Sequence, residues 1–284
     1  MIRFGASMLS WISRWTPENG RYAIQKTAAC GFDLLEISLP ATLELDVKMI
    51  KEDLMAHGLD ATYSLILPAD HHLPIHPDKA LRLICNSIDF VEEMGGNYLG
   101  GVLYSAIGCF TGAPRNAGEI EVLRDVLKSV GGYAFSRRIT IGIEPINRYE
   151  TYLLTSAREV IELIAEIDCP ALGLMLDTFH MNIEENGFYD PVIAAGGQLK
   201  YIHMTESDRG MLGEGNVQWD DFFRALAKIN YSGDLVLENF SSAVPGMSAL
   251  TSLWRPSKYN AESLAVGSLK FMKSKIAAHF SQNH

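Results

Sequence analysis

The sequence contains few cysteines, and none of them are closely spaced. The four cysteines, Cys30, Cys85, Cys109 and Cys169, lie far apart in a chain of 284 residues and form no C-x-x-C motif. This spacing argues against a disulfide framework and against a zinc knuckle. Scattered free cysteines are typical of a reducing compartment, so we expect a cytoplasmic protein.

The sequence also lacks an excess of positive charge. Its 34 acidic residues outnumber its 24 basic residues, and the net charge of −10 disfavours nucleic acid or an anionic membrane as the main partner. The N-terminal residues Met1–Gly5 show no basic head or apolar run of a signal peptide, so we expect the mature protein to begin here. The uncharged stretch Met94–Pro114 contains six glycines, and we interpret it as a buried strand that enters a loop rather than as a membrane span.

Short apolar runs alternate with longer segments of helical period, which indicates a parallel sheet covered by helices. The runs that we expect as strands are Arg3–Met8, Asp33–Ser38, Asp60–Ile66, Asn97–Leu103, Ile139–Glu144, Ala171–Asp177, Leu199–Met204 and Asp234–Glu238. This pattern predicts a single-domain (β/α)8 TIM barrel over residues 1–284, with an open doubly wound sheet as the alternative. No G-x-G-x-x-G motif follows the first expected strand, which removes the main support for dinucleotide binding.

Four successive expected strands end in residue types that bind metals. These residues are Glu144, Asp177, His203 and Glu238. In a parallel barrel the carboxyl ends of the strands converge on one mouth, so we expect the four side chains to lie together. A helix cap or a solvated loop residue is the alternative for any one of them. Three carboxylates and one imidazole suit Mn²⁺, Mg²⁺ or Co²⁺, whereas a structural zinc site would normally include cysteine.

Three longer segments carry a family resemblance. They are EPINRYE at residues 144–150, LDTFHMNIEE at 176–185 and HMTESDR at 203–209. They resemble the ketose 3-epimerases, namely the D-tagatose, D-psicose (D-allulose) and L-ribulose 3-epimerases of the xylose isomerase-like superfamily of TIM barrels. The resemblance covers most of the chain and includes Gly31-Phe32-Asp33 and Gly100-Gly101.

The resemblance implies a cofactor and a role for each matching residue. It implies one divalent metal ion, Mn²⁺ before Co²⁺ or Mg²⁺, held by Glu144, Asp177, His203 and Glu238. Glu144 and Glu238 match the two catalytic acid/base groups. The residues that match the contacts to the carbonyl end of the substrate are Glu150, His180 and Arg209. The resemblance also implies a homodimer or homotetramer and a small-molecule sugar as substrate.

The chemistry agrees with these roles. Removal of a carbon-bound proton next to a ketone forms an enediolate, whose charge a divalent ion on O2 and O3 stabilises. Inversion at C3 then requires proton delivery from the opposite face, which a pair of carboxylates can provide. We therefore predict C3 epimerisation of a free ketose. The alternatives are a 1,2-aldose–ketose or hydroxypyruvate-type isomerase, an epimerase of a phosphorylated or modified ketose, an endonuclease-IV-like enzyme, and a non-catalytic sugar-binding protein.

Some features leave the substrate open. The family usually has aromatic residues after the first and fourth strands, where this chain has Ser7 and Ala106-Ile107. The loop Ile66–His76 is either a lid or a polar surface loop. Glycines in Gly213–Asn216, together with Ser241-Ser242, could bind phosphate, although a tight turn is the simpler interpretation. Aromatic and apolar residues that either wall the sugar or pack in the ordinary way are Trp11, Trp15, Ile107, Phe110 and Trp254.

Overall fold

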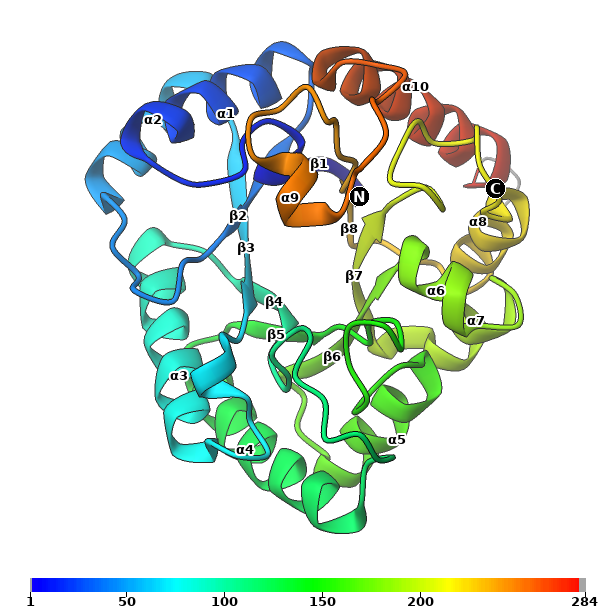
Figure 1. Cartoon of the computed structure of the whole chain (residues 1–284). Helices are drawn as coiled ribbons and strands as arrows, with labels where there is room; N and C mark the ends of the chain where they lie inside the picture. The colour runs from blue at the N-terminus through cyan, green and yellow to red at the C-terminus, as the bar shows by residue number, and fades with distance from the viewer. Residues whose placement is uncertain (1, 281–284) are drawn as a thin grey trace.

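The computed structural model describes residues 2–280, and in it eight parallel strands close into a barrel (Figure 1). Each strand pairs with the next, and β8 returns to pair with β1. The strands are β1 (Arg3–Ser7), β2 (Leu34–Ser38), β3 (Asp60–Ile66), β4 (Tyr98–Val102), β5 (Thr140–Ile143), β6 (Leu172–Asp177), β7 (Leu199–Met204) and β8 (Asp234–Leu237). The predicted (β/α)8 TIM barrel is confirmed, and every predicted strand agrees with the observed one to within one residue at each end.

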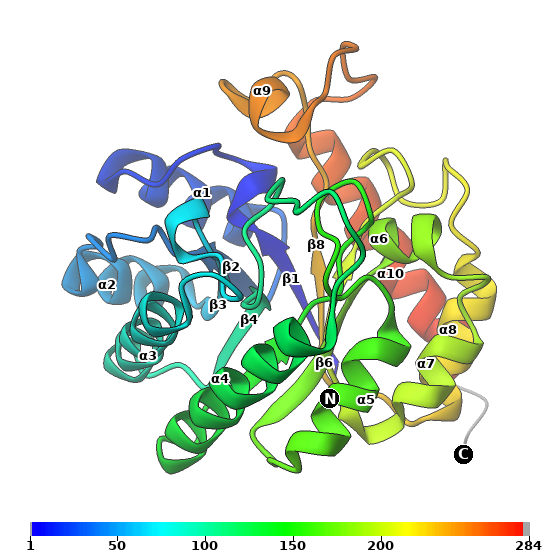
Figure 2. The same cartoon turned by 60° about the horizontal axis from the view of Figure 1, so that its bottom comes forward.

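Helices surround the barrel, except for α9, which lies above its mouth (Figure 2). The helices are α1 (Pro17–Ala29), α2 (Val47–His57), α3 (Pro77–Met94), α4 (Ala117–Ser136), α5 (Ala157–Ile167), α6 (Thr178–Glu184), α7 (Asp190–Ala195), α8 (Trp219–Lys228), α9 (Met247–Thr251) and α10 (Ala261–Phe280). A capping box of Ser156 and Glu159 begins α5. Helix α3 ends where Gly95 adopts a φ of 79°, a conformation that glycine tolerates best. The assignment of all residues 1–284 to one domain stays a prediction.

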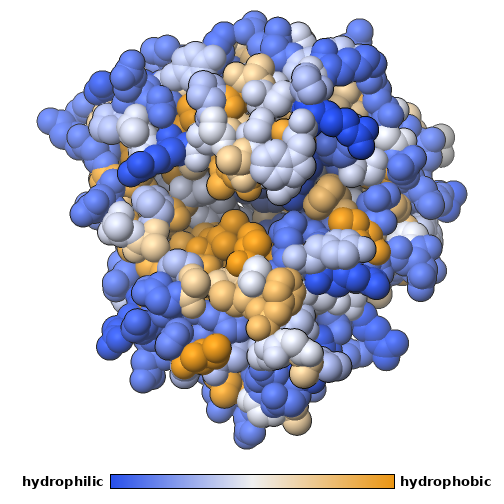
Figure 3. Space-filling view, in the orientation of Figure 1, coloured by the Kyte–Doolittle hydropathy of each residue, from blue (hydrophilic) through white to orange (hydrophobic). Residues whose placement is uncertain are grey.

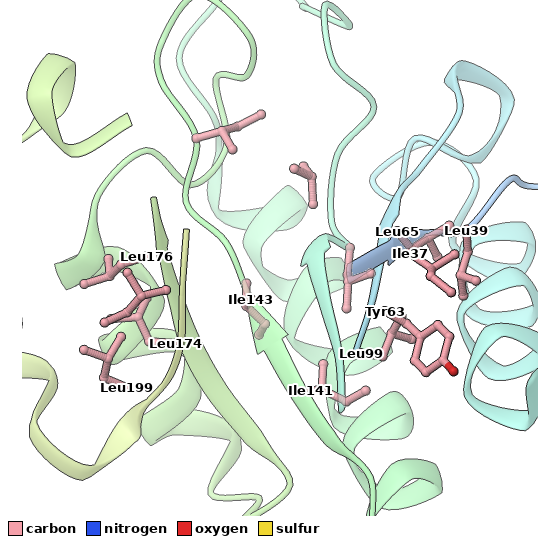
Figure 4. Packing of buried hydrophobic residues seen from close by; sticks show 14 of the residues in the cluster. Ile37, Leu39, Tyr63, Leu65, Leu99, Ile141, Ile143, Leu174, Leu176 and Leu199 are labelled. Atoms are coloured by element: carbon pink, nitrogen blue, oxygen red, sulfur yellow. The ribbon is translucent and has the colours of Figure 1, made fainter. Parts of the chain in front are cut away.

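Side chains alternate between the two faces of each strand. The outward side chains form one core with the helices, and the inward side chains form a second core inside the barrel. Residues such as Ile141, Ile143, Leu174 and Leu176 belong to the large cluster formed with the helices (Figure 4). A second, smaller cluster consists of Leu34, Tyr98, Met175, Tyr201 and Val236. These residues alternate with the first set along the strands, so they lie inside the barrel.

Two glycines make room for the inner cluster. A Cβ atom added to Gly100 or to Gly142 would lie 2.3 or 2.0 Å from the hydroxyl oxygen of Tyr98. Tyr98 stacks on Tyr201 with ring centroids 4.3 Å apart. The barrel interior is therefore a packed core below its mouth, and the residues that continue the inward phase at the strand ends form the floor of that mouth.

The segment between β8 and α10, which includes α9, rises above the mouth (Figure 2). Ser242 and Ser257 exchange two hydrogen bonds at its base, each backbone N–H donating to the other's hydroxyl. Lys258 and Tyr259 both donate to the carboxylate of Glu214 in the β7–α8 loop, at 2.8 Å each. These bonds attach the raised segment to its neighbour. Among residues 2–280, no helix combines the length and hydrophobicity needed to cross a membrane.

Candidate active site

The structure brings together the four strand-end residues that the sequence singled out. Asp177 and His203 are paired in register between β6 and β7. Glu144 and Glu238 each extend the strand ladder by one residue, because their backbone N–H groups donate to Gly101 and Met204. The Nδ1 atom of His203 lies 3.9 Å from Glu144 Oε1 and 3.6 Å from Glu238 Oε2. One ligand atom each from Glu144, Asp177 and His203 falls within 4.8 Å of the others.

His203 has one satisfied and one unsatisfied ring nitrogen. Its Nε2 lies 2.8 Å from Glu36 Oε2 on β2, whereas its buried Nδ1 makes no hydrogen bond within residues 2–280. An unpaired buried polar atom is rare in a folded protein and usually indicates an absent ligand, water or ion. Here it faces the glutamates of β5 and β8, which is the position of a metal ligand.

The electrostatics of the cluster also favour a cation. Burial, together with the nearby carboxylates of Asp177 and Glu238, raises the pKa of Glu144 well above its usual value. Burial lowers the pKa of His203, but Glu36 and Glu238 outweigh that effect and raise the pKa well above normal. A nearby cation would favour the charged form of these buried carboxylates. Oxygen ligands with one imidazole fit a divalent ion such as Mn²⁺.

Arg209 lies within this cluster and not at the surface. Its Nη1 donates to Asp177 Oδ2 at 2.9 Å and also to Glu238 Oε2. Its guanidinium carbon lies 4.1 Å from the ring centroid of Phe179 and 4.9 Å from that of Phe240. The side-chain partners of Arg209 are thus Asp177 and Glu238 and not its sequence neighbours Glu206 and Asp208. The residue also has a φ of 61°, a backbone conformation that costs a non-glycine residue about 1 kcal/mol or more.

His180 points one protonated nitrogen at the same cluster. Its Nδ1 accepts from the backbone N–H of Asn147 at 3.1 Å, with the Asn147 side-chain amide at 2.9 Å. Nε2 therefore carries the hydrogen, and it lies 3.7 Å from Asp177 Oδ2 and 3.9 Å from Glu144 Oε1. Burial lowers the pKa of His180 to about 3, so the ring is neutral. The same Asn147 amide donates to Glu150 at 2.9 Å, which joins Glu150 to this arrangement.

Asp177 both caps a helix and takes part in the charged cluster. Its Oδ1 caps α6 by accepting from the backbone N–H of Phe179 at 2.8 Å, while Oδ2 accepts from Arg209. The helix cap fixes the orientation of the carboxylate, because one oxygen is held by the backbone. The second oxygen then faces the other charged groups.

Three residues near the site escaped the sequence reasoning: Glu36, Asn147 and Glu206. Glu36 lies two positions before the expected end of its strand. Because it is two residues after Leu34, its side chain is on the same face of β2 and points into the barrel, and this alternation could have identified it. Asn147 stood inside a recognised segment without an assigned role. Glu206 also stands inside a recognised segment, and it is fully buried.

Residues of the loops around the mouth are held by burial and hydrogen bonds. His72 of the Ile66–His76 loop is buried and accepts from the backbone N–H of Ala106 at 3.2 Å, so this loop is attached to the β4–α4 loop. Trp11 is only 3% exposed and donates to Thr27, so it packs in the ordinary way. Trp15 likewise packs against Gly20.

The surface around the mouth is partly hydrophobic. The space-filling view shows a hollow near the middle of this face with hydrophobic surface beside it (Figure 3). Ile107 and Phe110 of the β4–α4 loop are 45% and 51% exposed. Trp254 is 76% exposed and borders a cavity of about 640 Å³ between the raised segment and the β7–α8 loop, which Phe240 also lines.

Comparisons with known proteins agree with this geometry. A family model described as "Xylose isomerase-like TIM barrel" matches residues 24–275. The chain is 34% identical to a ketose 3-epimerase of Arthrobacter globiformis over 283 residues, or 98% of each chain. It is 35% identical to the crystallised D-allulose 3-epimerase of a Methylomonas species in complex with D-allulose, with a TM-score of 0.91 and coverage of 96% and 97%. An L-ribulose 3-epimerase structure has a TM-score of 0.93 at 27% identity, covering 99% and 97% of the two chains.

Proposed function

We propose that this chain inverts the C3 centre of a free ketose. The chain is an isomerase that belongs to the ketose 3-epimerases of the xylose isomerase-like TIM barrel family. The observation that carries the proposal is the placement of two glutamates, Glu144 after β5 and Glu238 after β8, beside Nδ1 of His203, which has no hydrogen-bond partner among residues 2–280. Two carboxylates that approach one centre from separate strands can serve opposite faces of a substrate carbon.

Glu144, Asp177, His203 and Glu238 are the residues that would hold one divalent cation. Mn²⁺ is our first choice and Co²⁺ or Mg²⁺ the alternatives, because the oxygen-rich donor set suits all three. When bound, the cation would supply Lewis-acid stabilisation of negative charge on the ketose oxygens.

The protein residues would divide the remaining work. One of Glu144 and Glu238 removes the C3 proton and the other returns a proton to the opposite face, through a cis-enediolate of the sugar. Burial raises the pKa of both carboxyl groups, which brings them closer to the range in which a group can both accept and donate a proton. His180 Nε2–H and the Arg209 guanidinium would donate to substrate oxygens at the carbonyl end. Glu150 would accept from a substrate hydroxyl.

The β7–α8 loop supports a free sugar over a phosphorylated one. The carboxylate of Glu206 accepts from the backbone N–H groups of Ser207, Gly213 and Val217 and from the indole of Trp219, at 2.8 to 3.1 Å. These are donors of the kind that a phosphate would need at the usual phosphate position of a TIM barrel. The Glu206 carboxylate already accepts from these donors, so they are not free to bind a phosphate.

The test is NMR of the Mn²⁺-loaded protein in D₂O with fructose, psicose, tagatose, sorbose, ribulose and xylulose. We expect deuterium at C3 together with the 3-epimer. Deuterium at C1 with formation of an aldose would contradict the proposal in favour of a 1,2-isomerase. The matched controls are Glu144→Gln and Glu238→Gln against Glu214→Gln, which neutralises a glutamate that bonds to Lys258 and Tyr259 outside the cluster.

Two further expectations belong to this proposal. We expect a homodimer or homotetramer, which size-exclusion chromatography with light scattering would measure. We also expect a cytoplasmic location, which fractionation of the source cells would test.

A further inference from the structure

Glu36 is a buried carboxylate that the proposed mechanism does not use. It lies near the carboxyl end of β2 and is 1% exposed. A buried carboxylate is unfavourable unless strong hydrogen bonds or charges compensate it. Glu36 has both, because its Oε1 accepts from the Ser64 hydroxyl at 3.0 Å and its Oε2 lies 2.8 Å from His203 Nε2.

The contact with His203 determines what the other side of the ring presents. A carboxylate can only accept, so the Nε2 of His203 carries a hydrogen that points at Glu36. The lone pair of a neutral ring is then on Nδ1, which faces Glu144 and Glu238 at 3.9 and 3.6 Å and has no hydrogen bond within the described residues. Loss of Glu36 would free the ring to rotate or to change tautomer.

We propose that Glu36 is a positioning residue that acts through His203: it holds the Nε2–H tautomer and the ring orientation that present Nδ1 as a metal ligand. This inference rests on the metal site of the proposed function. Glu36, His203 and Glu238 also lie close enough to form a ligand group of their own. The Nε2 hydrogen bond favours the positioning role, because the ring nitrogen nearest Glu36 is occupied by that bond.

The experiment measures Mn²⁺ affinity by titration calorimetry for Glu36→Leu, Glu36→Gln and the matched control Ser64→Ala. Ser64 contacts the carboxylate oxygen that faces away from His203. We expect Glu36→Leu to weaken Mn²⁺ binding by about 10–100-fold, the usual effect of losing the carboxylate behind a metal-binding histidine. Glu36→Gln, which keeps an acceptor oxygen, should weaken binding less, and Ser64→Ala least.

A second readout separates positioning from general stability and from direct ligation. With saturating Mg²⁺, ¹⁵N-edited NMR should show a protected, low-field Nε2–H proton for His203 in the wild type and in Ser64→Ala. The signal should move upfield in Glu36→Gln and disappear in Glu36→Leu. An unchanged Nε2–H signal in both Glu36 variants would overturn the inference, even with lower stability or lower metal affinity. Because Glu36→Gln is nearly isosteric, it keeps this test available if Glu36→Leu does not fold.

His203→Ala distinguishes failure of the inference from failure of the proposed function. If His203→Ala loses Mn²⁺ binding but Glu36→Leu binds Mn²⁺ like the wild type, Glu36 has no positioning role and the metal site stands. If His203→Ala itself binds Mn²⁺ like the wild type, the proposed metal site is wrong and the inference fails with it.

Discussion

The two halves of the barrel mouth differ in chemistry. Strands β5 to β8 end at or next to Glu144, Asp177, His203 and Glu238. Strands β1 to β4 end in Ser7, Ser38, Ile66 and Val102, which are small or apolar. The β1–β4 half contributes one carboxylate, Glu36 of β2, which is directed at His203 of β7 in the charged half.

This difference indicates a division of labour. The charged half would carry out the proton transfers, which require fixed groups at short distances from one carbon. The β1–β4 half contributes apolar surface such as Ile66, Ile107 and Phe110, which are 45–51% exposed. Apolar contacts tolerate variation in a substrate more readily than hydrogen bonds do, so we expect this half to adjust preference and the charged half to determine the reaction.

The largest effect is expected at a proposed acid/base residue of the charged half. Glu144→Gln cannot exchange a proton, so kcat for epimerisation should fall by about 10²–10⁴-fold, the usual contribution of one such group. Initial rates by polarimetry or NMR would measure it, with metal content determined in parallel. A fall of less than tenfold with full metal content would remove Glu144 from the proton-transfer role.

A smaller effect is expected at Arg209. Arg209→Lys keeps the charge but loses the planar donor fork that lies between Phe179 and Phe240. A hydrogen bond to a charged group contributes about 1.5–3 kcal/mol, so kcat/KM should fall by roughly 10–100-fold. The measurement is kcat/KM for the ketose that turns over fastest. Wild-type kinetics in this variant would show that charge alone is sufficient.

The next effect is expected at Asn147, which supports both His180 and Glu150. Asn147→Ala removes the side-chain amide but keeps the backbone N–H that donates to His180. Loss of side-chain hydrogen bonds with a net contribution of about 1 kcal/mol predicts a fall in kcat/KM of roughly five- to tenfold. Tyr149→Ala serves as the control, because Tyr149 is 74% exposed in the same loop. Equal losses in the two variants would mean that the loop, and not the amide, matters.

The smallest effect is expected in the apolar half. Phe110→Ala trims a half-exposed side chain, so the free energy of unfolding should change by less than about 0.5 kcal/mol. We expect kcat on a five-carbon ketose to stay near the wild-type value while the ratio of kcat/KM between six-carbon and five-carbon ketoses changes. A fall in kcat on both sugars as large as the fall in kcat/KM expected for Arg209→Lys would contradict the inference. It would mean that the apolar half also determines the rate of the reaction.

Much of the fold and part of the site could be predicted from the sequence. Strand positions agreed to within one residue because each depends on a local run of apolar residues. Glu144, Asp177, His203 and Glu238 were identified because metal-ligand residue types recur at strand ends. Glu36 was missed because it precedes the end of its strand, where the run of apolar residues around it indicated only core.

The sequence by itself determined the alternating strands and helices, the positions of the strand ends, and the segments that identify the family, because these depend on residues close together in the chain. The tertiary structure alone decided which of these residues meet. Glu36 and His203 are 167 positions apart, and Arg209 reaches Asp177 and Glu238 rather than its own neighbours. Such contacts arise because closing the barrel directs the inward side chains of distant strands to one mouth, a constraint that no local pattern contains.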